Sequence, residues 1–184
     1  TATTAVDVQR ITADYDYPYL EHAPMEPMNA TALFHPTPNH PGTIEVWAPT
    51  QYGEEALRIA AYAAGVALKD ATCHVTLSGG GFGRRLHNDY VNQAVQVAKA
   101  YPGTPIKLIA SREECFRRSY YPPVMKARYD VTMDADNSVL SWDAKVAQAQ
   151  SVFQPYGMSR LALPTKSIRV SYGNIDAPLP FAWM

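Results

Sequence analysis

Residues 73–101, CHVTLSGGGFGRRLHNDYVNQAVQVAKAY, read as a short strand, a glycine-rich turn and an amphipathic helix. The strand is predicted by apolar residues at alternate positions, Cys73, Val75 and Leu77. The helix is predicted by an apolar side with helical spacing and ends before Pro102-Gly103. Its apolar side consists of Tyr90, Val91, Ala94, Val95, Val97 and Ala98.

The glycine-rich turn, SGGGFGRR at 78–85, is a candidate anion site. Its glycines flank Phe82, permit positive φ and leave backbone N–H groups uncovered. Such groups near a helix N-terminus suit an anion, and Arg84 and Arg85 add positive charge. A second interpretation stays open, in which the turn is a tight strand-to-helix connection with solvated arginines.

Two nucleotide-binding motifs are excluded at this turn. A dinucleotide fingerprint beginning at Gly79 requires glycine where Arg84 stands, and no Walker lysine follows at the required spacing. A nucleotide-binding enzyme of another kind is therefore disfavoured.

Composition narrows the class of protein further. The chain has 184 residues, is 47% hydrophobic and carries a formal net charge of −1, which suits one domain with a real core or a part of a larger domain. Nothing forms a basic face, so we expect no nucleic-acid partner. No apolar run reaches membrane-spanning length, and no signal-peptide pattern opens the sequence. Cys73 and Cys115 match neither a metal-ligand spacing nor a disulfide framework.

The remaining pattern predicts an α+β fold in which two helices pack on a mixed β-sheet, with a β-hairpin. We expect a single domain over 1–184, with 1–14 as a flexible lead-in. The expected elements are an extended segment at 20–32, a proline-rich loop at 35–42, strands at 43–49 and 105–110, a helix at about 52–68, a charged loop at 111–123, and a hairpin at 125–133 and 140–146. His22, His35 and His40 have a spacing that could suggest a metal site. The prolines between them favour a proline-rich surface loop instead.

Several motifs together resemble one family. The chain resembles the molybdenum-cofactor-binding subunit of the xanthine dehydrogenase family, whose motifs occur here in the same order along the sequence. The motifs are LEHAPMEPMNATA at 20–32, Thr50-Gln51, GGGFGRR at 79–85 and the loop starting SREE at 111–114. The sequence is most similar to the large (beta) subunit of isoquinoline 1-oxidoreductase and related aldehyde dehydrogenases.

The resemblance implies hydroxylation of an aldehyde or N-heterocycle carbon with water as the oxygen source. It also implies a molybdopterin cofactor, which in bacteria is typically the cytosine dinucleotide form. The resemblance implies that the Gly-Phe-Gly turn lies near the molybdenum and the phosphates of this cofactor. The implied cofactor-binding residues are Gly80, Gly81, Phe82, Gly83, Arg84 and Gln51, with the Phe82 backbone near the oxo ligand and no residue bound to the metal.

Departures from the family pattern refine the substrate. Xanthine-type members have glutamine at the position of Leu20 and glutamate at the position of Leu86. The two leucines argue against purines and for a less polar pocket. Arg84 and Arg85 stand where the family usually has glycine and lysine. Two alternatives stay open: the arginines alter how the phosphates are held, or they pack on the helix.

The family's subunit is several times longer than this chain, and its general-base glutamate lies in a later segment. We therefore expect a fragment with no catalytic residue of its own and no activity in isolation. Glu21, Glu26, His22 and His87 are candidate bases by residue type alone.

The expected partners are the rest of the large subunit, a [2Fe-2S] small subunit and a cytochrome c acceptor. The compartment is left open between bacterial cytoplasm and periplasm. If a partner domain is missing, we expect exposed aromatic residues, among them Trp142, Tyr120 and Tyr121. The alternative function is a non-catalytic interface module whose glycine turn only shapes domain packing.

Overall fold

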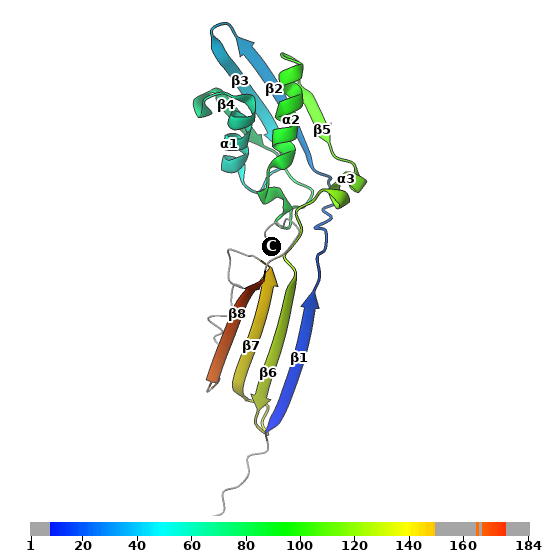
Figure 1. Cartoon of the computed structure of the whole chain (residues 1–184), viewed down its shortest axis with the longest axis vertical. Coiled ribbons are helices and arrows are strands. Elements are labelled where there is room, and N and C mark those ends of the chain that lie inside the picture. Colours follow the sequence, from blue (N-terminus) through cyan, green and yellow to red (C-terminus); the bar gives the residue numbers. More distant parts are fainter. Residues whose placement is uncertain (1–7, 150–164, 166, 176–184) are drawn as a thin grey trace, which may run out of the picture. The chain divides into compact units, whose positions relative to one another are not determined.

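The computed structural model describes residues 8–149, 165 and 167–175. These residues divide into two compact units (Figure 1). The helical unit comprises residues 20–122, and the described part of the sheet unit comprises residues 8–19, 123–149, 165 and 167–175. The single domain that we expect over 1–184 stays a prediction.

The helical unit contains a mixed four-stranded sheet in the order β4-β3-β2-β5. β3 and β4 are parallel, and the other neighbours are antiparallel. The helices α1 and α2 pack against this sheet (Figure 1), which confirms the predicted α+β arrangement. The elements are β2 (Asn29–Thr37), β3 (His40–Ala48), α1 (Gly53–Ala64), β4 (Ala71–Val75), α2 (Asp89–Ala100), β5 (Ile106–Ile109) and α3 (Arg112–Arg117), with short 3₁₀ helices η1 (Leu68–Asp70) and η2 (Arg84–Leu86).

Small side chains form much of the core between the helices and the sheet. Alternate residues of β2 and β3 are buried, so one face of the sheet is covered and apolar. Alanines on α1 and α2 let the two helices approach the sheet and each other closely. The buried alanines of the helices are Ala56, Ala60, Ala61, Ala63, Ala64, Ala94 and Ala98.

The sheet unit is a four-stranded sheet in the order β1-β6-β7-β8. Its strands are β1 (Gln9–Tyr17), β6 (Met125–Met133), β7 (Val139–Ala149) and β8 (Ser167–Ile175). β6 and β7 form the predicted hairpin. The Asp134 side chain closes its turn by accepting hydrogen bonds from the backbone N–H groups of Asp136 and Ser138.

Some expected boundaries differ in the structure. Residues 9–14, which we expect in a flexible lead-in, belong to β1, because its alternating apolar residues pair in register with β6. The expected loop at 35–42 is instead the end of the β2–β3 hairpin, with Asn39 in the left-handed region at φ 61°. The charged loop at 111–123 contains α3, which Ser111 caps by accepting a hydrogen bond from the Glu114 N–H.

The weak pattern beyond residue 149 did not predict β8. Residues 1–7 of the expected lead-in and residues 150–164, 166 and 176–184 lie outside the described part. Within the described part, the helices are too short or too polar for any of them to cross a membrane.

Candidate functional site

The glycine-rich turn follows the parallel strand β4 and leads through η2 into α2. Gly80, Phe82 and Gly83 have φ values of 100°, 52° and 97°. The predicted positive φ is therefore confirmed, and it extends to the one large side chain in the bend. Phe82 is 67% exposed, so its ring is not packed beneath other side chains.

Backbone amides of the turn fall into two groups. Gly79 N donates to Glu26 Oε2 at 2.7 Å, and Gly83 N donates to Gln51 Oε1 at 3.1 Å. Between them, the amides of Gly80, Gly81 and Phe82 donate to no acceptor among the described residues. The turn therefore keeps consecutive donors available for a group from outside this part of the chain.

Gln51 fixes the inner side of the turn. Its Oε1 accepts from Gly83 N and, at 3.2 Å, from Arg85 N, while its own backbone N–H donates to Arg85 O at 3.1 Å. A Cβ atom on Gly81 would lie 2.4 Å from Gln51 Oε1, so a side chain there would displace the Gln51 side chain from the turn. The Gln51 side-chain amide N–H₂ donates to no acceptor among the described residues and remains a candidate donor to a ligand.

Arg85 is fully buried and is used inside the protein. Its guanidinium donates to Gly80 O at 2.7 Å, to Pro49 O at 3.1 Å, and to the backbone O and Oε2 of Glu26 at 2.8 and 3.0 Å. The side chain thus ties the glycine turn to the end of β3 and to the segment before β2. Its charge faces Glu26 and not solvent.

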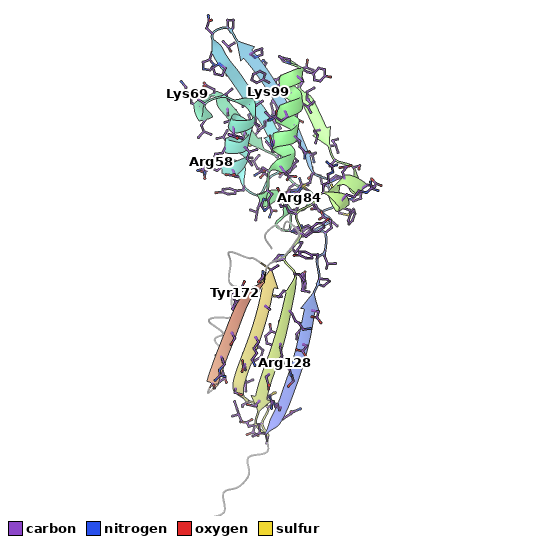
Figure 2. All side chains as sticks on the ribbon, in the orientation of Figure 1. Arg58, Lys69, Arg84, Lys99, Arg128 and Tyr172 are labelled. Carbon is purple, nitrogen blue, oxygen red and sulfur yellow. The ribbon has the colours of Figure 1, made fainter. Side chains whose placement is uncertain are left out.

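Arg84, labelled in Figure 2, is also buried, and its guanidinium reaches the first residue of α2. It pairs with both carboxylate oxygens of Asp89 at 2.8 and 3.0 Å and donates to Ser119 Oγ at 3.1 Å. Its guanidinium carbon lies 5.3 Å from the centre of the Tyr120 ring. Burial lowers the pKa of Arg84, but the hydrogen bonds and charge of Asp89 outweigh burial and hold that pKa above its ordinary value.

Two of the interpretations drawn from the sequence do not describe the surroundings of Arg84 and Arg85: that they are solvated, and that their charges face an anion. They are not solvated on the first helical turn, and each is already paired with a carboxylate. An anion at the turn would therefore be held by backbone amides. The open alternative that the arginines pack against the helix is the one closer to the observed geometry.

The candidate bases have different surroundings. Glu26 accepts from Gly79 N, from Arg85 and, at 2.9 Å, from the Asn29 amide. Burial raises the pKa of Glu26, but these donors outweigh burial and lower it. The His87 ring stacks on Tyr120 at 4.2 Å, and burial followed by the Arg84 charge lowers its pKa. Glu21 and His22 stay candidates by residue type.

Among the described residues, no group of His, Cys, Asp and Glu side chains is arranged to hold a metal ion. Sequence reasoning missed the roles of Asp89, Ser119 and Asn88. Asn88 is 1% exposed, and its Oδ1 lies 2.7 Å from Thr50 Oγ1, which fixes the start of α2 against the end of β3.

Comparison with known proteins identifies the family. The model of the molybdopterin cofactor-binding domain matches residues 1–175. The chain belongs to this family. It is 32% identical over 126 residues to the isoquinoline 1-oxidoreductase subunit beta of Brevundimonas diminuta and 30% identical over 126 residues to a membrane-bound aldehyde dehydrogenase [pyrroloquinoline-quinone] of Gluconacetobacter polyoxogenes. Each match covers 68% of the chain and 16% of the relative.

Solved structures share the fold of this molybdopterin cofactor-binding domain. Quinoline 2-oxidoreductase from Pseudomonas putida 86 matches 95% of the chain with a TM-score of 0.73 and 16% identity. CO dehydrogenase from Oligotropha carboxidovorans matches 98% with a TM-score of 0.72 and 14% identity. The chain spans 23% of the length of each. The predicted membership of the molybdenum-cofactor-binding subunits is confirmed.

The glycine turn fits the cofactor that the family name implies. A molybdopterin is anionic, and Gly80, Gly81 and Phe82 offer unoccupied N–H donors in a bend with an exposed ring. A Cβ atom on Gly81 would displace the Gln51 side chain that supports the turn, so glycine suits this position. The residues present are therefore compatible with an anionic group at this turn.

Proposed function

We propose that this chain holds the molybdenum cofactor of a hydroxylase against the amides of Gly80, Gly81 and Phe82. The observation that carries the proposal is the set of consecutive unoccupied donors between two anchored amides, Gly79 and Gly83. The bound cofactor would supply the two-electron oxidation of an aldehyde or N-heterocycle carbon, with water as the oxygen donor. The chain's own part is to bind and orient.

Each proposed binding residue has a defined part. Gly80, Gly81 and Phe82 donate through the backbone, and the Gln51 side-chain amide offers one more donor. Gly83 shapes the bend through its positive φ, and its N–H is anchored on Gln51. Arg84, which pairs with Asp89, supports the start of α2 and contributes to cofactor binding only indirectly.

The finer assignments also belong to this proposal. We infer a less polar substrate pocket from Leu20 and Leu86, which replace the polar residues of xanthine-type members. From the family resemblance we infer the cytosine dinucleotide form of the cofactor and a separate [2Fe-2S] subunit, with which the two unmatched cysteines of this chain are consistent. A cytochrome c acceptor and inactivity of the isolated chain complete the proposal.

Glycine 81 offers a direct test of the proposed function. Gly81→Ala places a Cβ atom where Gln51 Oε1 lies, whereas Gly173→Ala meets no atom within 4 Å and serves as the control. In the complete subunit that contains this chain, we expect Gly81→Ala to lower the molybdenum bound per subunit, measured by mass spectrometry of the purified protein. Gly173→Ala should load normally.

The same experiment decides between this function and the interface module. The unbonded Gly80–Phe82 amides favour cofactor binding, whereas the anchoring of the turn by Glu26 and Gln51 favours a purely structural bend. Thermal unfolding shows whether Gly81→Ala is folded. A folded Gly81→Ala subunit with normal molybdenum content would leave only the interface module.

A further inference from the structure

The sheet unit has two chemically distinct faces. On β1, Ile11, Ala13, Tyr15 and Tyr17 alternate with polar and charged residues, and the register with β6 and β7 places apolar residues opposite apolar ones. One face is therefore apolar across β1, β6 and β7. We call it the apolar face, and it includes Ile11, Tyr15, Tyr17, Tyr129, Val131 and Trp142.

The opposite face carries ion pairs between β1 and β6. Arg10 pairs with Asp130, Lys126 with Asp16 at 3.0 Å, and Arg128 with Asp14 at 3.7 Å. Arg128 is labelled on this sheet in Figure 2. A face of this composition is stable in water, as one side of an antiparallel sheet commonly is. The sheet therefore has one face suited to solvent and one that is not.

The apolar face is hollowed and poorly covered. It contains a concavity of about 640 Å³, and Ile11, Tyr15 and Tyr17 are 43%, 59% and 39% exposed. Tyr129 packs against both Tyr15 and Trp142, with ring centres 5.7 and 5.5 Å apart. This surface has the aromatic composition of an interface and exposes side chains that a sheet normally buries against a second layer.

Trp142 supplies an independent sign of a missing neighbour. Its indole Nε1 is buried but donates to no acceptor among the described residues. A buried indole N–H without an acceptor is unfavourable relative to a bonded one. A segment that covers the apolar face and offers a carbonyl or carboxylate oxygen to Trp142 would remove this cost.

We propose that the apolar face is the docking surface for another segment of the same subunit, lying outside these 184 residues. The chain spans 16% of its curated relatives and 23% of the related structures, so most of such a subunit is available as a cover. The docking segment is apolar and carries an oxygen acceptor opposite Trp142. This inference concerns the sheet unit and does not depend on the glycine turn.

Cysteine labelling tests the proposal. Ile11→Cys and Tyr15→Cys report on the apolar face, and Thr12→Cys and Asp14→Cys on the same strand are matched controls for the charged face. Maleimide labelling is measured for the 184-residue chain and for the complete subunit, with the unsubstituted protein correcting for Cys73 and Cys115. We expect fast labelling at all four positions in the short chain. In the complete subunit, Ile11→Cys and Tyr15→Cys should label about tenfold or more slowly, and the controls at unchanged rates.

Other occupants would give different results. Equal labelling of Ile11→Cys in the short chain and the complete subunit overturns the proposal. Protection at residue 11 in a monomeric short chain means that another part of these 184 residues is the cover, which also overturns it. Protection that disappears on dilution, with a dimer seen by light scattering, identifies a second copy as the occupant and likewise overturns it.

Discussion

Arg85 and the glycine turn share one oxygen atom of Glu26. Glu26 Oε2 accepts from Arg85 Nη2 at 3.0 Å and from Gly79 N at 2.7 Å. The same guanidinium group donates to Gly80 O through Nε at 2.7 Å. Arg85 and Glu26 therefore hold the entry to the turn from both sides, through a charge pair in which the guanidinium is fully buried and the carboxylate is 32% exposed.

Arg85→Met should strongly destabilise the helical unit. The substitution removes a fully buried guanidinium and leaves Glu26, Gly80 O and Pro49 O without their donor. Leaving buried acceptors such as these without a donor costs about 1–3 kcal/mol each. We expect a loss of this size in the free energy of unfolding, measured by urea denaturation.

Arg58→Met is the control for Arg85→Met. Arg58, labelled in Figure 2, forms an exposed pair with Glu54 one turn earlier on α1. Such a pair contributes about 0.3–0.5 kcal/mol. Similar losses from the two substitutions would contradict the structural role assigned to Arg85.

Acidification should weaken the turn through Glu26. The pKa of Glu26 is lower in the folded protein than its ordinary value of 4.5, because the donors around it outweigh the effect of burial. In this range the unfolded state binds more protons than the folded state, so stability falls as the pH falls through and below 4.5. The free energy of unfolding, measured across this range, should drop less in Glu26→Gln than in the wild type.

His87 acts in a different pH window. Its folded pKa lies below its ordinary value of 6.5, mainly because of burial and then because of the Arg84 charge. Its contribution to stability is therefore lost as the pH falls below 6.5, before Glu26 begins to titrate. A difference between the wild type and Glu26→Gln that appears only above pH 4.5 would count against the role of Glu26.

Local patterns in the sequence predicted the helical unit and the hairpin well. The helical spacing from Tyr90 to Ala98 and the alternation in β3 and β6 are properties of single elements, each with one buried face. The pairing of β1 with β6 is different. It joins residues more than a hundred positions apart, and β1 carries few strong local strand signals beyond its alternation.

The contents of the site were harder to predict for a similar reason. Glycine content revealed the bend and its positive φ at Gly80 and Gly83. It could not reveal that Glu26, 59 positions earlier, pairs with Arg85, because side-chain partners are set by tertiary packing. The sequence therefore located the turn, but it left Arg84 and Arg85 open between solvent, a ligand and packing on the helix, and it named neither carboxylate partner.

The isolated chain should show no hydroxylase turnover. Glu26 is occupied by structural hydrogen bonds, and His87 is stacked on Tyr120, so neither is placed as a free base. Oxidation of an aldehyde with an artificial electron acceptor, assayed on the 184-residue chain, is the measurement. Turnover above that of a Gly81→Ala chain would contradict the proposed need for the rest of the subunit.

Phe82 should affect cofactor loading more than stability. The ring is 67% exposed, so Phe82→Ala removes little buried surface, and we expect the free energy of unfolding to change by less than about 1 kcal/mol. Phe82→Gly should be slightly more stable than Phe82→Ala, because glycine adopts φ 52° without strain. Both substitutions loosen the bend that carries the unoccupied amides and should lower the molybdenum content of the complete subunit. Phe116→Ala, which removes a ring from a 46% exposed residue of α3, is the control. Equal molybdenum content in all three variants would show that the Phe82 ring has no part in holding the cofactor.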